Sequence, residues 1–116
     1  MTQKEKDLLL KDLCARLPYG VKFKHRDKSK VCKILSITPV YGAVVYFDEY
    51  INEPKKCYID DVEPYLFPMS QVVEEIVTTS NKHIAVNVDF FHKNHIDYRG
   101  LIPKGLANDA TNLNIY

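Results

Sequence analysis

Apolar residues recur at helical spacing near the start of the chain. Residues 4–17 read "KEKDLLLKDLCARL", in which four leucines share one side of a helical wheel. These are Leu9, Leu10, Leu13 and Leu17. The helix is expected to end at the following "PYG", because Pro18 disfavours a helical backbone in the residue before it and Gly20 permits a turn. The pattern predicts a helix over 4–17 whose apolar stripe packs on its own domain or meets a partner.

Over residues 21–66 the pattern changes to short runs in which apolar and polar positions alternate. Turn-forming sequences such as "RDKS", "PVYG" and "INEP" separate these runs. The predicted strands are "VKFKH" at 21–25, "KVCKILSI" at 30–37, "AVVYFDEY" at 43–50, "KKCYI" at 55–59 and "EPYL" at 63–66. The "DDV" before the last strand is compatible with one short helical turn. Short strands at this spacing predict a small, strongly bent antiparallel barrel.

The third predicted strand carries candidate partner-binding residues. Its period-2 alternation places Val45 and Phe47 in the core. The residues of the opposite, exposed face are then Tyr46, Asp48 and Tyr50. A register shift of one residue would bury Asp48 and expose Phe47, which is unfavourable on both counts. Exposed tyrosines supply amphipathic contact area and an aspartate supplies a charged anchor, so this face is a candidate site for a protein partner. The alternative is that they are ordinary surface residues of a sheet.

Residues 67–107 are predicted to form a helical section. The run "MSQVVEEIVTT" at 69–79 has helical character, and "DFFHKNHI" at 89–96 suits a short helix with its two phenylalanines turned inward. The run "NKHIAVNV" at 81–88 fits either a strand or a loop. The polar residues 108–116 are expected to form a loosely held tail.

Length and composition limit the classes of protein that the chain can represent. With 116 residues it is long enough for one domain with a modest core and too short for two. The net charge is +1, so no global field directs the chain toward nucleic acid or a membrane. No apolar run approaches the roughly 20 residues of a membrane span, and the charged start "MTQKEKD" lacks the apolar core of a secretion signal. Three cysteines without a CxxC pair argue against a disulfide framework or a cysteine zinc site, and for a reducing cytoplasm.

The stretch "AVVYFDEYINEPKKCYIDDVEPYL" at 43–66 resembles the third to last strands of a Tudor or SH3-like barrel. The matching positions are Val45, Tyr46, Tyr50, Asn52, Glu53, Asp61 and Leu66. Tudor domains hold methylated arginine or lysine in an aromatic cage, and the resemblance puts Tyr46 and Tyr50 near two cage positions. The segments that carry the other cage aromatics read "HRDKSKV" here and hold none beyond His25, and Ile51 replaces the loop glycine of the family. The resemblance therefore implies the barrel more than it implies the reading of methyl groups.

Three further blocks resemble a family of uncharacterised short proteins. They are "KDLCARLPYGVK" at 11–22, "VEPYLFPMS" at 62–70 and "HIDYRGLIPKGLANDATNLNIY" at 95–116. That family is found in gut Bacteroides species and in their phages and mobile elements. The resemblance implies a bacterial cytosolic or phage-encoded protein, and it implies no activity.

Candidate chemistry is sparse. Asp89, His92 and His95 are spaced i, i+3 and i+6, which could place all three on one side of a helix as metal ligands. Helical zinc sites more often use i and i+4, so surface or helix-capping histidines are the simpler interpretation, and neither a metal nor a cofactor is expected. Cys14, Cys32 and Cys57 lie in a predicted helix or strands, without the local context of a reactive thiol. The sequence predicts a protein that is not an enzyme.

The stretch "KFKHRDKSKVCK" at 22–33 holds six Lys or Arg residues and one Asp. On one edge of the predicted barrel this stretch could contact phosphates. The residues proposed for that contact are Lys22, Lys24, Arg26 and Lys28. Acids accumulate between residues 48 and 63, so the surface is expected to be dipolar, and charged residues on strand surfaces commonly serve only to solvate and protect an edge.

The sequence therefore predicts a single α+β domain over 1–116. Its parts are a helix over 4–17, a small SH3-like (Tudor-like) antiparallel β-barrel over 21–66, a helical section over 67–107 and a tail over 108–116. The predicted function is that of a non-catalytic interaction module or accessory protein that binds a protein partner in the cytoplasm of a gut bacterium, or for its phage. The alternative is a nucleic-acid-binding accessory protein that uses residues 22–33.

Overall fold

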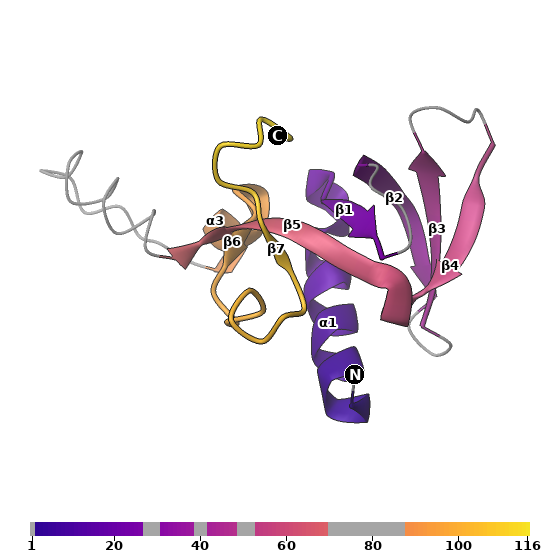
Figure 1. The fold of residues 1–116 in the computed structure, drawn as a ribbon, viewed down its shortest axis with the longest axis horizontal. Helices are drawn as coiled ribbons and strands as arrows, with labels where there is room; N and C mark the ends of the chain where they lie inside the picture. The colour runs from indigo at the N-terminus through magenta and orange to yellow at the C-terminus, as the bar shows by residue number, and fades with distance from the viewer. Residues whose placement is uncertain (1, 27–30, 39–41, 49–52, 70–87) are drawn as a thin grey trace, which may run out of the picture.

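The computed structural model describes residues 2–26, 31–38, 42–48, 53–69 and 88–116. It shows an α+β architecture in which an N-terminal helix packs against a mixed sheet (Figure 1). The elements of the first part are α1 (Gln3–Arg16), the 3₁₀ turn η1 (Leu17–Tyr19), β1 (Lys22–His25), β2 (Val31–Thr38), β3 (Ala43–Asp48), β4 (Lys55–Tyr58), the 3₁₀ turn η2 (Ile59–Asp61) and β5 (Val62–Pro68). Those of the second part are α3 (Val88–Lys93), β6 (Ile96–Asp97) and β7 (Asn108–Asp109). No helix in the described ranges combines the length and the apolar character needed to cross a membrane.

The helix α1 forms where the leucine pattern predicts it. Its first turn is closed by a reciprocal pair, in which the Glu5 N–H donates to Thr2 Oγ1 at 3.1 Å and the Thr2 N–H donates to Glu5 Oε1 at 3.0 Å. This capping box satisfies N–H groups that a helix start otherwise leaves open. After η1, Gly20 adopts a φ of 72°, which glycine tolerates without strain, and turns the chain into β1. The prediction of a helix that ends at "PYG" is confirmed.

Five strands pair antiparallel in the order β4-β3-β2-β1-β5. The first four follow one another as a meander, and β5 returns to β1 after η2. The five strands and the short helical turn expected from the sequence are therefore present. Among the described residues, β4 pairs with β3 alone and the sheet does not close. The α+β class is confirmed, whereas closure into a barrel is not seen.

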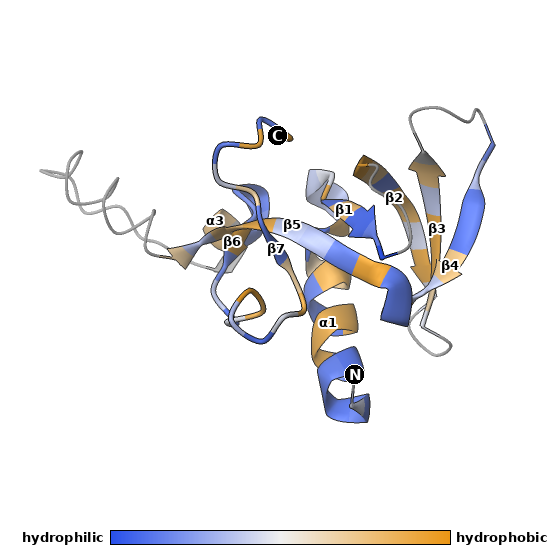
Figure 2. Ribbon diagram, in the orientation of Figure 1, coloured by the Kyte–Doolittle hydropathy of each residue, from blue (hydrophilic) through white to orange (hydrophobic). Residues whose placement is uncertain are grey.

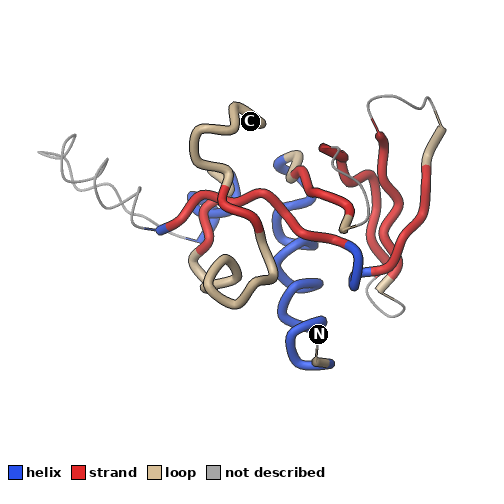
Figure 3. The backbone as a smooth tube through the Cα atoms, viewed as in Figure 1, coloured by secondary structure: helices blue, strands red, loops and turns tan. Residues whose placement is uncertain are grey.

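The strand β5 joins the meander to the C-terminal section (Figure 3). Its residues 62–64 pair with β1, residues 65–66 pair in parallel with β7, and residues 67–68 pair in parallel with β6. The sequence predicts neither β6 nor β7, because a strand of two residues carries no alternation that can be recognised.

The core lies between α1 and the sheet face that α1 covers, which we call the inner face. Leu9 and Leu13 of α1 are completely buried, and so are Phe23 of β1 and Val44 of β3. Figure 2 shows hydrophobic residues concentrated in β3 and in the middle of α1, while β4 is mainly hydrophilic. The leucine stripe of α1 therefore packs on its own domain rather than facing solvent.

The inner face of β3 is formed by Val44 and Tyr46, and not by Val45 and Phe47. Tyr46 is only 2% exposed, and its ring meets that of Phe23 edge-on with the centroids 5.3 Å apart. Val45 and Phe47 are half-buried on the other face. The prediction that Tyr46 is exposed while Val45 and Phe47 fill the core is wrong.

Strand pairing explains why the other side of β3 faces inward. The sequence "AVVYF" is apolar at every position, so its own pattern does not choose a face. Tyr46 lies opposite Ile34, and Val44 lies opposite Cys57; both of these neighbours are buried. Directly opposed residues share a face, so the neighbouring strands fix which side of β3 enters the core.

The C-terminal section is held by specific contacts. The Asp97 carboxylate accepts hydrogen bonds from the backbone N–H groups of Leu101 at 2.8 Å and Ile102 at 2.9 Å. β7 pairs with β5, and the hydroxyl of Tyr116 bonds to the backbone of both β1 and β5. The prediction that residues 108–116 form a loosely held tail is therefore wrong. The polar composition of residues 108–116 gives no sign of the long-range contacts that Tyr116 makes with β1 and β5.

The helices predicted after residue 67 have mixed outcomes. The one over 69–79 lies outside the described residues apart from Met69, and the run 81–88 lies outside them apart from Val88. α3 confirms the short helix predicted over 89–96, but it ends at Lys93. Soon after, His95 adopts a φ of 58°, which a continuing α-helix does not allow.

Two buried charges tie α1 to the C-terminal section. The side chains of Asp12 and Arg16 are fully buried, and Arg16 Nε lies 2.7 Å from Asp12 Oδ2. The Arg16 guanidinium also donates to the backbone carbonyls of Phe91 and Ile96, and Arg99 Nε lies 3.0 Å from Asp12 Oδ1. We call Asp12, Arg16 and Arg99, with the two carbonyls that Arg16 contacts, the Asp12–Arg16 cluster. Each buried charge has an opposite charge or a carbonyl beside it, which a buried ion pair requires.

Candidate functional site

The sheet face opposite α1 carries lysines from three strands. Lys22 and Lys24 flank the buried Phe23 on β1, and Lys33 is exposed between two buried neighbours on β2. Lys56 is exposed next to the buried Cys57 on β4. Because side chains alternate along a strand, all these lysines project from the outer face. We call the set Lys22, Lys24, Lys33 and Lys56, together with Val45 and Phe47 of β3, the lysine face.

The strand register brings these residues into one surface. Lys22 lies opposite Lys33, Lys33 lies opposite Phe47, and Val45 lies opposite Lys56. Opposed residues on neighbouring antiparallel strands are about 5 Å apart, and alternate residues of one strand are about 7 Å apart. The lysine face thus has cations on both sides of the apolar residues of β3, three from β1 and β2 and one from β4.

The margin of the lysine face adds apolar side chains. A register shift between Ile34 and Ser36 marks a bulge in β2, and Leu35 within it is 44% exposed. Tyr58 lies two residues beyond Lys56 on β4 and is 56% exposed. Two-residue spacing puts Tyr58 on the same face as Lys56. Exposed aromatic rings near cations can stack on nucleic-acid bases.

Acids are scarce on this surface. Among the described outward-facing residues of β1 to β4 there is none. Among the residues that the structure describes, Glu63 of β5 lies directly opposite Lys24. Its carboxylate lies 3.6 Å from Arg26 Nε and accepts a hydrogen bond from Asn108 Nδ2 at 3.1 Å. Glu63 is therefore occupied by its own neighbours.

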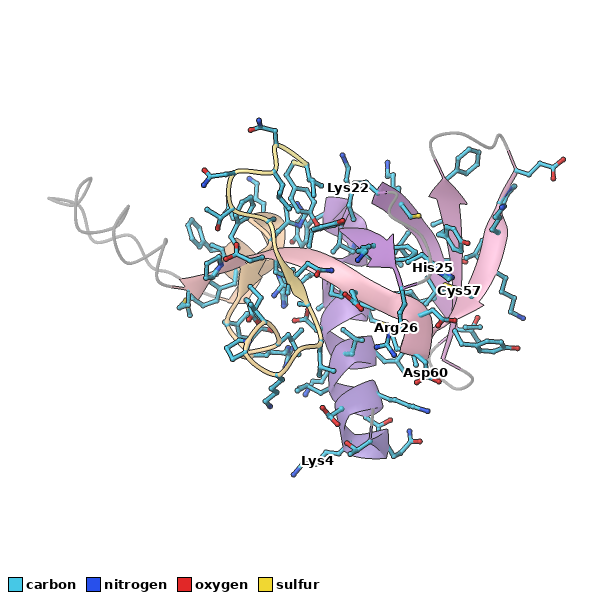
Figure 4. The ribbon with its side chains drawn as sticks, viewed as in Figure 1. Lys4, Lys22, His25, Arg26, Cys57 and Asp60 are labelled. Atoms are coloured by element: carbon cyan, nitrogen blue, oxygen red, sulfur yellow. The ribbon has the colours of Figure 1, made fainter. Side chains whose placement is uncertain are left out.

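Of the four cations proposed from the sequence, the structure brings Lys22 and Lys24 onto one face. Arg26 is exposed at the other end of β1 from Lys22 (Figure 4) and pairs with Glu63. Lys28 lies outside the described residues. Sequence reasoning missed Lys56, because only the pairing of β3 with β4 shows that this distant lysine joins the same surface.

The residues proposed for a protein partner do not form one exposed group in the described structure. Tyr46 is buried in the core. The side chain of Asp48 and the whole of Tyr50 lie outside the described residues. Binding of a protein partner through these last two residues stays a prediction.

His92 and His95 have separate surroundings. His92 Nε2 lies 2.8 Å from the hydroxyl of Tyr98, whereas the ring of His95 stacks on Tyr116 with the centroids 3.7 Å apart. The side chain of Asp89 lies outside the described residues. Within the described part of the chain, no group of three acidic, histidine or cysteine side chains is arranged to hold a metal ion.

Within the described residues, the three cysteines form no disulfide. Cys32 and Cys57 are buried, and Cys14 is half-buried on α1. Burial raises the pKa of the Cys14 thiol, which reduces its reactive thiolate form at neutral pH. These surroundings are those of packing residues, as expected from the sequence.

Comparisons of this chain with protein-family models, with curated proteins and with solved structures found no match.

Proposed function

We propose that this protein is a non-catalytic module that binds single-stranded nucleic acid on the lysine face. The observation that carries the proposal is the gathering of Lys22, Lys24, Lys33 and Lys56 from β1, β2 and β4 on one sheet face, without an acid among the described outward residues of these strands. Lysines contact backbone phosphates, and the counterions released from the phosphates favour binding. This is the second of the two functions expected from the sequence, carried by a modified set of residues.

The apolar residues of the lysine face favour a single strand over a duplex. Phe47 lies among the lysines, and Tyr58 stands at their margin. Open sheet faces with aromatic side chains bind unpaired bases by stacking, while flanking cations follow the backbone. A duplex hides its base faces, and reading its major groove requires an inserted helix or ribbon. The broad sheet face therefore suits unpaired bases better.

The fold family and the cellular location of the protein are also proposals. The order β4-β3-β2-β1-β5, with a 3₁₀ turn between the fourth and fifth strands, supports the SH3-like interpretation of residues 21–66. The resemblance of the sequence blocks supports a cytoplasmic role in a gut bacterium or its phage. A protein partner is the competing function, and the test below separates it from nucleic acid.

The test is the binding of labelled single-stranded DNA and RNA oligonucleotides at low salt, measured by fluorescence anisotropy. With about three phosphate contacts, the logarithm of the binding constant should fall with the logarithm of salt concentration with a slope of about −2. The triple variant Lys24→Glu, Lys33→Glu and Lys56→Glu should lose binding. A matched control replaces three lysines that line a depression beside α1 with glutamate. These lysines are Lys4, Lys11 and Lys104.

Each outcome has a defined meaning. The control variant has the same change in net charge, so retained binding would assign the effect to the lysine face rather than to overall charge. Equal losses in both triple variants would contradict a localised site. If the wild-type protein binds neither DNA nor RNA at low salt, the proposed function is wrong and a protein partner becomes the better explanation of this face.

A further inference from the structure

The last residue of the sequence, Tyr116, inserts its hydroxyl between two strands. The backbone N–H of Lys22 donates to Tyr116 Oη at 2.8 Å, and Tyr116 Oη donates to the carbonyl of Tyr65 at 2.8 Å. Lys22 begins β1, and the adjacent pair in the ladder with β5 is Phe23 with Pro64. The phenol thus continues the bridge between β1 and β5 from the end of their ladder.

The ring of Tyr116 is held by aromatic neighbours. It stacks on His95 at a centroid distance of 3.7 Å and an interplanar angle of 12°, and it lies 6.0 Å from the ring of Phe67. Burial raises the pKa of the Tyr116 hydroxyl, so the hydroxyl stays protonated and able to donate. The contact therefore combines two hydrogen bonds with ring stacking.

The same C-terminal segment binds the side chain of one lysine of the lysine face, Lys22. Lys22 Nζ donates to the carbonyl of Ile115 at 2.8 Å and lies 5.9 Å from the centroid of the Tyr116 ring. Figure 4 shows Lys22 at the end of β1 nearest the C-terminal segment. Lys22 is also directly opposite Lys33, a like-charge pairing that the Ile115 carbonyl offsets. Lys22 therefore already has a partner inside the folded chain.

The connection that leads to this contact is exposed. Asn112, Leu113 and Asn114 are all exposed, and both asparagines have positive φ values, 63° and 52°. Their side chains add little burial, so the seating of the segment depends mainly on Ile115 and Tyr116. Segments with few buried contacts open at a lower free-energy cost than the core.

We infer that residues 112–116 form an intramolecular cover that holds Lys22 and withholds it from the nucleic acid. This inference rests on the proposed function of the lysine face. The Ile115 carbonyl and a phosphate oxygen are alternative acceptors for one ammonium group, and the hydrogen bonds of Tyr116 hold the carbonyl beside Lys22. The segment therefore tunes affinity without contributing a base contact.

The experiment compares Tyr116→Ala with wild type in the oligonucleotide assay over a salt series. Loss of the ring should release Lys22, so binding should tighten several-fold. One additional phosphate contact should also make the salt slope steeper by about 0.7. Tyr116→Phe is the matched control, since it keeps the stacking ring and removes the hydroxyl, and it should give an intermediate gain. Adding Lys22→Gln to Tyr116→Ala should remove the gain.

Lys22→Gln in the otherwise wild-type chain gives an independent check that does not depend on the folding of the Tyr116 variants. The inference predicts a change in salt slope much smaller than about 0.7, because Lys22 of the wild-type chain stays bonded to the Ile115 carbonyl and contacts no phosphate. A full loss of 0.7 would overturn the cover while the proposed function remained. Unchanged binding by Tyr116→Ala would do the same. Absence of binding by every variant and by wild type would overturn the proposed function, and the cover with it.

Discussion

Residues 3–68 and residues 88–116 reach their folded positions through different kinds of contact. In the first region, α1 and the strands β1 to β5 bury apolar side chains that recur with the period of their element. The second region has one short helix and two strands of two residues. It attaches through the Asp12–Arg16 cluster, the pairing of β6 and β7 with β5, and the hydroxyl of Tyr116. Leu101 and Leu106 also join the hydrophobic core, without periodic spacing. Periodic burial builds the scaffold, whereas polar contacts, short strand pairings and a few irregularly spaced apolar residues place the remainder on it.

The strongest test of this contrast is to replace Arg16, which joins α1 to the C-terminal section. Arg16→Met should lower the free energy of unfolding by about 3–5 kcal/mol, because it leaves the Asp12 carboxylate buried with Arg99 as its remaining cation. Urea denaturation followed by circular dichroism measures the change. The double variant Asp12→Leu with Arg16→Met should be less destabilised than the single variant, since it leaves no buried carboxylate there.

The chain offers an exposed ion pair as the control for that experiment. Lys6 Nζ lies 3.2 Å from Asp60 Oδ1, and these side chains are 31% and 50% exposed. Lys6→Ala should therefore cost less than about 1 kcal/mol. A loss below about 1 kcal/mol for Arg16→Met as well would show that the buried cluster does not anchor the C-terminal section.

The next test concerns the regular region and the two faces of β3. Tyr46→Ala should cost about 3 kcal/mol, because it leaves a cavity against Phe23. Phe47→Ala should cost about 1 kcal/mol, because that ring is half-buried on the outer face. Thermal unfolding of the two variants compares them directly. A larger loss for Phe47→Ala would contradict the observed register of β3.

The same contrast explains how far the sequence predicts the fold. The helix at 3–16 and the strands of the meander follow from periodicity and turn residues, because each is defined by many neighbouring positions. The inward face of β3 does not follow, because "AVVYF" is apolar on both sides and its neighbours decide. The anchor residues are long-range pairs without any period. One signal was available: Asp12 and Arg16 fall within the leucine stripe of α1 at a spacing of four, which suggests a buried ion pair.

The candidate site divides in the same way. Alternation in "VKFKH" predicts that Lys22 and Lys24 share a face opposite Phe23, and the structure agrees. Lys56 joins them through the pairing of β4 with β3, and Tyr116 reaches Lys22 across 94 positions of sequence. Neither contact can be recognised from a local pattern in the sequence. The extent of the lysine face and its cover therefore required the tertiary structure.

The smallest expected effect concerns the stacked rings of His95 and Tyr116 and the pH dependence of the free energy of unfolding. His95 is buried with its Nδ1 unpartnered, and burial, together with the charges of Arg16 and Lys22, lowers the pKa of His95 to about 4. In the unfolded chain its pKa is close to 6.5, so between these values the unfolded state binds the additional proton. This contribution to stability is therefore complete above about pH 6.5 and is lost as the pH falls toward 4, by an amount on the order of 2 kcal/mol.

Urea denaturation at pH 7 and pH 5 measures this dependence, with His95→Asn as the comparison. Asparagine tolerates the positive φ of position 95 and does not titrate in this range. The variant should be less stable than wild type at pH 7, since it lacks the ring that stacks on Tyr116. Its stability should nevertheless fall less between pH 7 and pH 5. Equal falls in wild type and variant would show that His95 is not the group responsible. The pH dependence would then have to come from elsewhere in the chain, and the stacked pair would act only through its packing.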